Sequence, residues 1–229
     1  MKTLSPPIDL IRRSIEIFFK KENLTFFLKI YFPVFILNLL QALRVNNNIV
    51  GELEKGNLQY FSDKPVLIAF LVLIFVIGTV FYIWFSAVSL ESVIRVVNSG
   101  TIEFKSTYRK GWGYALKLFF AGALVTLIVA LGLILLIIPG IVFAVWLSLV
   151  QFGIADKSLG IIDSLKESKA LISGRFWKVL GRMIVFGLFS VLVSILFSFI
   201  PYGMGMPISS LFGALFILPI YLLYKELKG

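Results

Sequence analysis

The sequence predicts an all-α polytopic membrane protein with six transmembrane helices and three interfacial amphipathic helices. Of the 229 residues, 59% are hydrophobic and only 15% are charged, whereas soluble domains carry roughly 25% charged residues. A single core of this length could not hide so much apolar surface from water. We therefore expect the bilayer to be the solvent for most of the chain.

Windows without Asp, Glu, Lys and Arg predict the spans, because a charge at mid-membrane costs about 2.5–3.5 kcal/mol on the insertion scale. A single crossing needs about 20 residues. The four windows cover residues 30–43, 65–90, 118–155 and 183–224. The first two each predict one span, and the first extends back to Leu24 because the long stem of Lys29 can snorkel. The last two are each long enough for two spans.

Proline and glycine divide both long windows, since these residues end helices and form turns. Pro139-Gly140 interrupts the third window, and the segment from Pro201 to Pro207 interrupts the fourth. Each window is therefore predicted to form a tight helical hairpin. The fourth span, 141–155, is short for a crossing, so it either tilts little or borrows residues from across the Pro139-Gly140 turn.

The distribution of positive charge predicts the orientation. Six spans place both termini and the segments 95–117 and 156–182 on one side, which then holds most of the 22 Lys and Arg residues. By the positive-inside rule, this side is cytoplasmic. We expect a plasma-membrane protein with both termini in the cytoplasm and a polar insertion, residues 44–65, outside it.

Short amphipathic segments precede the first, third and fifth spans, and such helices lie in the membrane interface with the apolar face toward lipid. Ser5 and Pro6 predict the N-cap and first helical position of the first segment. A triplicated unit of interfacial helix plus hairpin would cover about 5–97, 101–157 and 160–227 of a single domain, although chance similarity remains an alternative. The apolar faces comprise Ile8, Ile11, Ile15, Phe18 and Phe19; Phe104, Tyr108 and Trp112; and Ile161, Leu165, Ser168 and Ile172.

The net charge of +10 points to anionic lipid headgroups on the cytoplasmic side as partners. Nucleic acid is not expected, because the basic residues lie near span ends and no nucleic-acid motif appears. A protein partner or a homo-oligomer is left open. Headgroup contact is predicted for Arg12, Arg13, Lys20, Lys21, Arg109, Lys110, Arg175, Lys178 and Arg182.

Catalysis is not expected. The chain has no Cys and no His, which removes the commonest metal ligands and the commonest general base. It also has no nucleophile-and-base pair and no phosphate-binding loop motif. We therefore predict no enzyme activity, no cofactor and no metal site.

Four polar residues near span ends form a candidate intramembrane site: Glu91, Arg95, Gln151 and Asp156. Glu91 could be a proton or cation site facing the bundle, or one half of an interfacial ion pair with Arg95 four residues later. The ion pair is favoured, because more than twenty charge-free residues precede Glu91 and carry it past the hydrocarbon core. Asp156, beside Gln151, has the same two interpretations, and the structural one is again favoured.

Two stripes of small residues lie on single helical faces, namely Ser190, Ser194 and Ser198 in the fifth span and Gly122 and Thr126 in the third. Either stripe could line a polar path. Close helix packing through small residues is the favoured interpretation.

Residues 133–177 resemble the membrane-domain family attached to bacterial glycerophosphodiester phosphodiesterases, together with related six-span membrane proteins. The resemblance rests on Ile138-Pro139-Gly140-Ile141, Asp156, Ser164 to Ser168 and Gly174 to Trp177. Family members often carry a basic residue inside the Pro-Gly helix, where this chain has only apolar and Ser residues around Trp146. The resemblance implies a six-span fold and no activity for the membrane part. The phosphodiesterase barrel is not among these residues.

The expected function is that of a multi-pass inner-membrane scaffold that interacts with lipid or with a partner. The alternative is a small transporter or exporter of an apolar or amphipathic substrate. Coupled transporters usually need a charge deep in a span, and no predicted span contains one. The scaffold is therefore favoured.

Overall fold

The computed structural model describes residues 4–43, 65–98, 103–201 and 204–229, which form helices joined by turns, with no strand among them. The helices long and apolar enough to cross a membrane confirm the predicted all-α polytopic fold, and the chain is a multi-pass membrane protein. These six candidate spans are Lys21–Gln41, Ile68–Asn98, Phe104–Leu135, Ile137–Lys157, Phe176–Ser198 and Gly205–Lys228.

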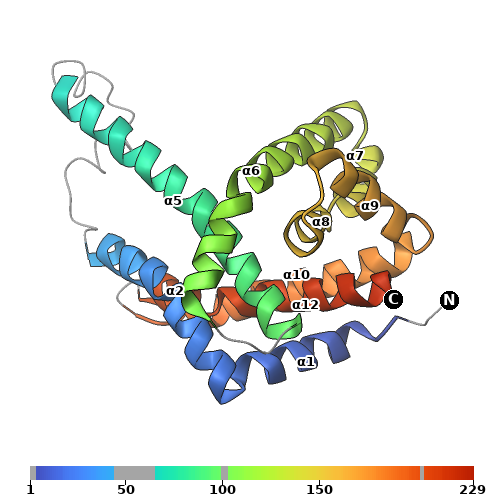
Figure 1. Ribbon diagram of the computed structural model, residues 1–229, viewed down its shortest axis with the longest axis horizontal. Helices are drawn as coiled ribbons and strands as arrows, with labels where there is room; N and C mark the ends of the chain where they lie inside the picture. The colour runs from blue at the N-terminus through green and yellow to red at the C-terminus, as the bar shows by residue number, and fades with distance from the viewer. Residues whose placement is uncertain (1–3, 44–64, 99–102, 202–203) are drawn as a thin grey trace.

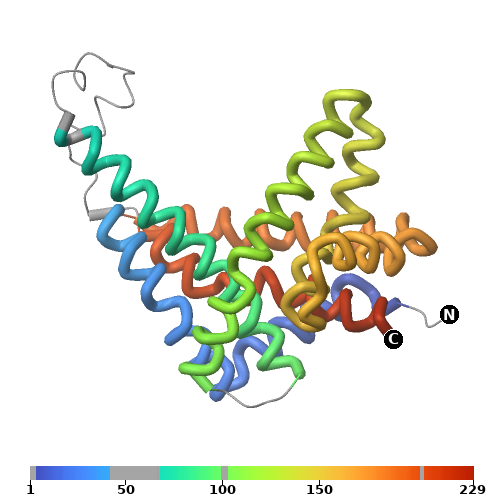
Figure 2. Tube along the Cα trace, turned by 45° about the horizontal axis from the view of Figure 1, so that its top comes forward, coloured from blue at the N-terminus to red at the C-terminus, as the bar shows by residue number. Residues whose placement is uncertain are grey.

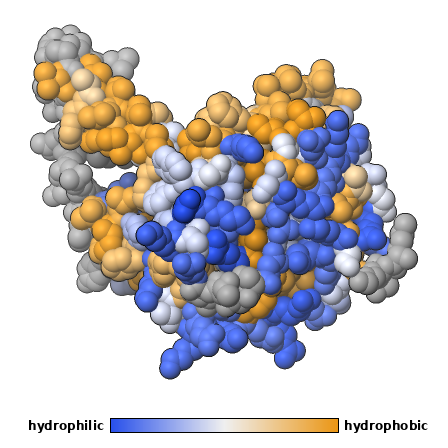
Figure 3. Space-filling model, viewed as in Figure 1, coloured by the Kyte–Doolittle hydropathy of each residue, from blue (hydrophilic) through white to orange (hydrophobic). Residues whose placement is uncertain are grey.

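Two arms diverge from a common base (Figures 1 and 2). One arm consists of α2 (Lys21–Leu43) and the N-terminal half of α5 (Pro65–Asn98), and the other is the hairpin of α6 (Phe104–Leu135) and α7 (Ile137–Trp146). On the face drawn in Figure 3, apolar residues cover both arms. Such exposed apolar arms are what a helix surrounded by lipid requires.

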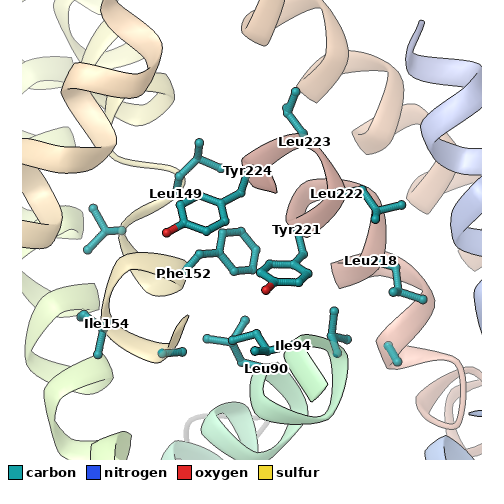
Figure 4. Close-up of a cluster of buried hydrophobic side chains, with 14 of the residues drawn as sticks. Leu90, Ile94, Leu149, Phe152, Ile154, Leu218, Tyr221, Leu222, Leu223 and Tyr224 are labelled. Carbon is teal, nitrogen blue, oxygen red and sulfur yellow. The ribbon is translucent and has the colours of Figure 1, made fainter. Parts of the chain in front are cut away.

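The core lies at the base, where the C-terminal half of α5 meets α8 (Val150–Lys157) and α12 (Gly213–Lys228) (Figure 4). Phe152 of α8 packs its ring against Tyr221 and Tyr224 of α12, with ring centroids 5.3 and 5.4 Å apart. Aromatic side chains bury about 150–250 Å² each and dominate such contacts. This cluster therefore holds the charged ends of three spans together.

The α6–α7 hairpin turns at Leu136, which has extended backbone angles (φ −160°, ψ 140°), so the expectation that Pro139-Gly140 forms the turn is wrong. Pro139 lies in the first turn of α7, where its missing N–H costs nothing. A Cβ on Gly140 would lie only 2.7 Å from the backbone nitrogen of Leu133. Gly140 therefore lets the two helices approach closely just after the turn.

The fourth span borrows residues from across the predicted turn and is made of two helices, α7 and α8, with a bend between them. Ser168 of α9 (Ile161–Ser173) supports this bend. Its hydroxyl donates to the Trp146 carbonyl oxygen at 2.6 Å and accepts from the Leu149 N–H at 3.2 Å. The Trp146 carbonyl and the Leu149 N–H at the bend therefore both have a hydrogen-bond partner, which buried backbone groups require.

The fourth charge-free window breaks where expected. The span α10 (Phe176–Ser198) ends before Pro201, and α11 (Gly205–Ser210) begins the last span. A second break at Leu211-Phe212 separates α11 from α12. A Cβ on Gly213 would lie 2.3 Å from the ring of Tyr31, so the absence of a side chain there lets α2 approach the last span.

Two of the three predicted amphipathic helices are separate helices, namely α1 (Pro7–Phe19) and α9. The remaining predicted helix, residues 104–112, is not separate, because it continues without a break into the span and forms the beginning of α6. Gly111 does not end the helix. Instead it allows close packing, since a Cβ there would lie 3.0 Å from backbone atoms of Val88 in α5.

The buried face of α1 differs from the predicted apolar face. Leu10 and Ser14, which lie outside the predicted face, are buried against the protein together with Phe18, while Ile8 and Phe19 of the predicted lipid-facing side are exposed. Pro6 is the N-cap of α1 and no side chain caps the helix. The predicted capping role of Ser5 is therefore wrong, because its hydroxyl donates instead to Glu226 Oε1 at 2.6 Å.

The predicted apolar face of α9 packs against protein rather than pointing away from it. Ser168 and Ile172 are buried, and Ile161 and Leu165 are half-buried against the core. The exposed side of α9 carries Asp163, Lys166 and Lys169 together with Ile162.

Candidate functional site

Glu91 is the centre of a charged network between α5 and α6. Its side chain is fully buried. Oε1 accepts a hydrogen bond from Arg95 Nε at 2.8 Å and lies 3.1 Å from Lys110 Nζ, and the Tyr114 hydroxyl lies 3.1 Å from Oε2. Burying a carboxylate is costly unless it is paired and hydrogen-bonded, and here both conditions are met.

Local sequence explains how these groups meet. Arg95 follows Glu91 by one turn of α5, and Tyr114 follows Lys110 by one turn of α6. Gly111 lets α6 lie close against α5 at this level. The expectation of an exposed interfacial pair is therefore wrong in one respect: Glu91 pairs with Arg95 as predicted, but it is enclosed and has a second cation.

A basic pocket lies beside this network, between the ends of α5, α6 and α8. Its volume is ≈ 470 Å³. Among the described residues, Arg109 and Lys117 have no ion-pair partner, whereas Arg95 and Lys110 both pair with Glu91. The pocket therefore favours anions. Its lining consists of the basic residues Arg95, Arg109, Lys110 and Lys117 with Ser106, Gly113, Tyr114, Ile154 and Ser158.

A lateral groove of ≈ 600 Å³ lies between α5, α6 and the α7–α8 bend. Its walls are mainly apolar, and the remaining positions are uncharged, including Thr79, Ser86, Ser148 and Gln151. No charged side chain is among the described residues that line it. Its lining also includes Tyr82, Ile83, Leu90, Leu118, Phe119, Ala121, Gly122, Ala123, Val125, Thr126, Leu147 and Val150.

The small stripe at Gly122 and Thr126 lines this groove. Both residues are exposed, and a Cβ on Gly122 would have nothing within 4 Å. Within the described part of the chain, the expected close helix packing through this stripe is therefore wrong. Small side chains here widen the groove instead.

Asp156 belongs to a different network. Its Oδ1 accepts hydrogen bonds from Asn98 Nδ2 at 2.9 Å and from the Tyr221 hydroxyl at 3.2 Å, and Lys228 Nζ lies 3.2 Å from Oδ2. These contacts link α8 to α5 and α12, as the structural interpretation of Asp156 predicts. The four residues of the candidate polar site therefore occupy three places, with Gln151 in the lateral groove.

The basic residues predicted to meet headgroups differ in their engagement. Arg12 pairs with Glu16 on an exposed surface, and Arg13 lies 3.3 Å from Glu226. Arg182 donates to the carbonyl oxygens of Leu4 and Ser5 at 2.9 and 2.6 Å, so its guanidinium is occupied within the protein. Lys20, Lys21, Arg109, Lys110 and Lys178 are exposed, and Arg175 is half-buried.

The serine stripe of α10 bonds to its own helix. The hydroxyls of Ser190, Ser194 and Ser198 donate to the carbonyl oxygens of Phe186, Ser190 and Ile195, respectively. Ser194 and Ser198 are exposed. Their role in packing stays a prediction, and a partner for it would have to come from outside the described residues.

The sequence analysis missed Tyr114 and Ser106 of the Glu91 network and Lys117 of the adjacent basic pocket. Ser106 Oγ accepts from Arg95 Nη1 at 2.7 Å. The spacing of Lys110, Tyr114 and Lys117 places them on one face of a helix. That face could have been recognised only if residues 104–112 had been read as continuous with the span.

The chain is similar to a UPF0259 membrane protein of Pectobacterium carotovorum subsp. carotovorum (strain PC1), with 27% identity over 123 residues. The match covers 51% of this chain and 49% of the relative, so the chain spans about half the length of the curated relative it matches. No family model and no solved structure matches. The similarity agrees with a multi-pass membrane protein, while the link to phosphodiesterase-associated membrane domains stays a prediction.

Proposed function

We propose that this protein is a plasma-membrane scaffold whose basic end binds anionic headgroups of the cytoplasmic leaflet. The observation that carries the proposal is the basic pocket, in which Arg109 and Lys117 have no ion-pair partner among the described residues. Basic pockets between membrane helices are suited to anionic headgroups. The proposal involves neither catalysis nor a cofactor.

Contacts between distant segments support a single charged end. Ser5 N–H donates to Glu226 at 3.0 Å, while Arg182 holds the Ser5 carbonyl. Lys228 of α12 meets Asp156 of α8, whose neighbour Asn98 ends α5. The ends of these spans therefore come together, and hydrophilic residues cover much of the base (Figure 3).

The lateral groove is the one observation that favours the alternative, a small transporter or exporter of an apolar or amphipathic substrate. Coupled transport usually requires a protonatable or charged group on the path. Among the described residues, the groove lining carries none. Glu91 is enclosed by Arg95, Lys110 and Tyr114 and is not among the residues that line the groove.

Lipid selectivity tests the proposal. The purified full chain in detergent is titrated with dioleoyl-phosphatidylglycerol or with dioleoyl-phosphatidylcholine, and Tm is followed. A ligand at 100 times its Kd stabilises a protein by about 2.7 kcal/mol, so we expect a clear rise in Tm with the anionic lipid only. Salt at 1 M should reduce the rise, because it shortens the screening length to about 3 Å. Equal rises with both lipids would contradict the proposal.

A flux assay tests the alternative with the same protein. Reconstituted vesicles carrying a pH-sensitive dye report proton-linked flux. The scaffold predicts the same leak for wild type and Glu91→Gln. A flux that the wild type supports and a folded Glu91→Gln variant has lost would favour the transporter.

A further inference from the structure

The basic pocket and the lateral groove lie next to each other along the contact between α6 and α8. On α6, Tyr114 and Lys117 line the pocket, whereas Leu118 and Ala121 line the groove. Residues three or four apart on a helix are neighbours on one face. The two cavities are therefore one helical turn apart on α6.

Residues of α8 and its C-cap also line both cavities, in the reverse order along the chain. Val150 and Gln151 line the groove, whereas Ile154 and the C-cap residue Ser158 line the pocket. Each groove residue precedes a pocket residue by about one turn. On both helices, the pocket thus lies toward the charged end of the bundle and the groove lies farther from it.

The boundary between the cavities coincides with the expected membrane interface. Lys117 is the last charged residue before the charge-free window, and Asp156 is the first after it. The groove residues of α6, α8 and the α7–α8 bend lie inside this window, and those of α5 lie inside the charge-free window 65–90, at the depth of lipid tails. The pocket lies at the edge of these windows, at the depth of lipid headgroups.

The two linings have complementary chemistry. In the pocket, the guanidinium of Arg109 and the ammonium of Lys117 lack ion-pair partners among the described residues, and Arg and Lys bind phosphate through charge-assisted hydrogen bonds. In the groove, the α6 residues from Leu118 to Thr126 extend about 12 Å at 1.5 Å per residue. This length accommodates much of an acyl chain.

We propose that one anionic phospholipid binds along the α6–α8 contact, with its phosphate in the basic pocket and an acyl chain in the lateral groove. This inference rests on the proposed function and assigns it a specific site. A free phosphate would satisfy the cations but would leave the apolar groove unused. A neutral lipid would fill the groove but would leave the charge of Arg109 and Lys117 without a partner.

The test measures the affinity of the full chain in detergent for dioleoyl-phosphatidylglycerol, from the lipid dependence of Tm and from lipid retained in native mass spectra. Arg109→Gln with Lys117→Gln removes the two phosphate contacts. Hydrogen bonds to charged groups contribute about 1.5–3 kcal/mol, so Kd should rise about tenfold or more. The matched control, Lys105→Gln with Lys166→Gln, removes the same charge from exposed positions outside the pocket and should change Kd less than about twofold.

A second pair of variants tests the groove. Gly122→Leu fills open space in the lining, and it should weaken phosphatidylglycerol binding while Tm without lipid is unchanged. Gly187→Leu on α10 is the control, because a Cβ there also meets nothing within 4 Å. Photoactivatable acyl chains should cross-link to peptides that contain residues 118–126 or 147–151 in wild type, and this labelling should disappear in Gly122→Leu.

The outcomes separate this site from the proposed function. Stabilisation by sn-glycerol 3-phosphate equal to that by the lipid, with no effect of Gly122→Leu, would show a free-anion site and overturn the inference. If the wild type prefers phosphatidylglycerol but the pocket variant binds it as the control does, the site is wrong and the proposed function stands. If the wild type has no preference for the anionic lipid, both are wrong.

Discussion

Glu91 connects two spans through one buried carboxylate. Arg95 on the same helix and Lys110 and Tyr114 on α6 surround it. Isolated ion pairs on exposed surfaces contribute about 0–1 kcal/mol. A buried carboxylate differs, because removing its charge leaves hydrogen-bond donors that were arranged for an anion.

We expect Glu91→Gln to destabilise the protein by about 1.5–3 kcal/mol, the range for lost hydrogen bonds to a charged group. The change is nearly isosteric, so the effect reports charge rather than volume. Thermal unfolding in detergent measures it. Glu16→Gln is the control: Glu16 pairs with Arg12 where the two side chains are 62% and 79% exposed, so its effect should be within about 0.5 kcal/mol. Equal Tm values for both variants would contradict a stabilising network at Glu91.

Residue-level prediction from sequence was limited by contacts between helices. Glu91 and Arg95 are four apart, so their pairing follows from helical geometry alone. Lys110 and Tyr114 reach Glu91 only because α6 crosses α5 at Gly111. Because a single sequence does not show where two helices cross, the burial of Glu91 could not be predicted.

Helical elements were more predictable than single contacts, because the bilayer excludes charge and thereby marks the spans in the sequence. The breaks were less predictable. Pro139 predicted a turn at its own position, but proline is tolerated in the first turn of a helix, and the chain turns at Leu136 instead. Likewise, no sequence signal separates residues 104–112 from the rest of α6.

Gly140 tests the packing of the α6–α7 hairpin. A Cβ at this position would lie 2.4 Å from Leu133 Cγ and 2.7 Å from its backbone nitrogen. Overpacking of this kind costs typically 1–3 kcal/mol, so Gly140→Ala should lower Tm. Gly187→Ala, inside α10 with open space around it, should be neutral or stabilising by up to about 1 kcal/mol, because alanine favours helix over glycine. A Gly140→Ala variant as stable as Gly187→Ala would show that the hairpin is looser than described.

The whole molecule brings its two termini to the same end. Ser5 hydrogen-bonds Glu226, and Arg182 holds the carbonyl oxygens of Leu4 and Ser5. The even number of predicted spans also places the termini on one side, and the charge distribution predicts that this side is cytoplasmic. The polar insertion, residues 44–65, lies outside the described residues except for Pro65, so its predicted location stays a prediction. The threefold repeat also stays a prediction.

Reporter fusions decide the orientation of this shared end. The positive-inside rule predicts that it faces the cytoplasm, so green fluorescent protein fused after Gly229 should fluoresce, because it folds in the cytoplasm. Alkaline phosphatase inserted after Asn57 should be active, because it requires the outside. The same phosphatase placed at Gly229 should be inactive and provides the control. An active phosphatase at Gly229 with an inactive one at Asn57 would invert the orientation and place the basic pocket against the outer leaflet. Activity at Gly229 together with activity at the N-terminus would leave the shared end intact, whereas activity at only one terminus would contradict the contact between Ser5 and Glu226.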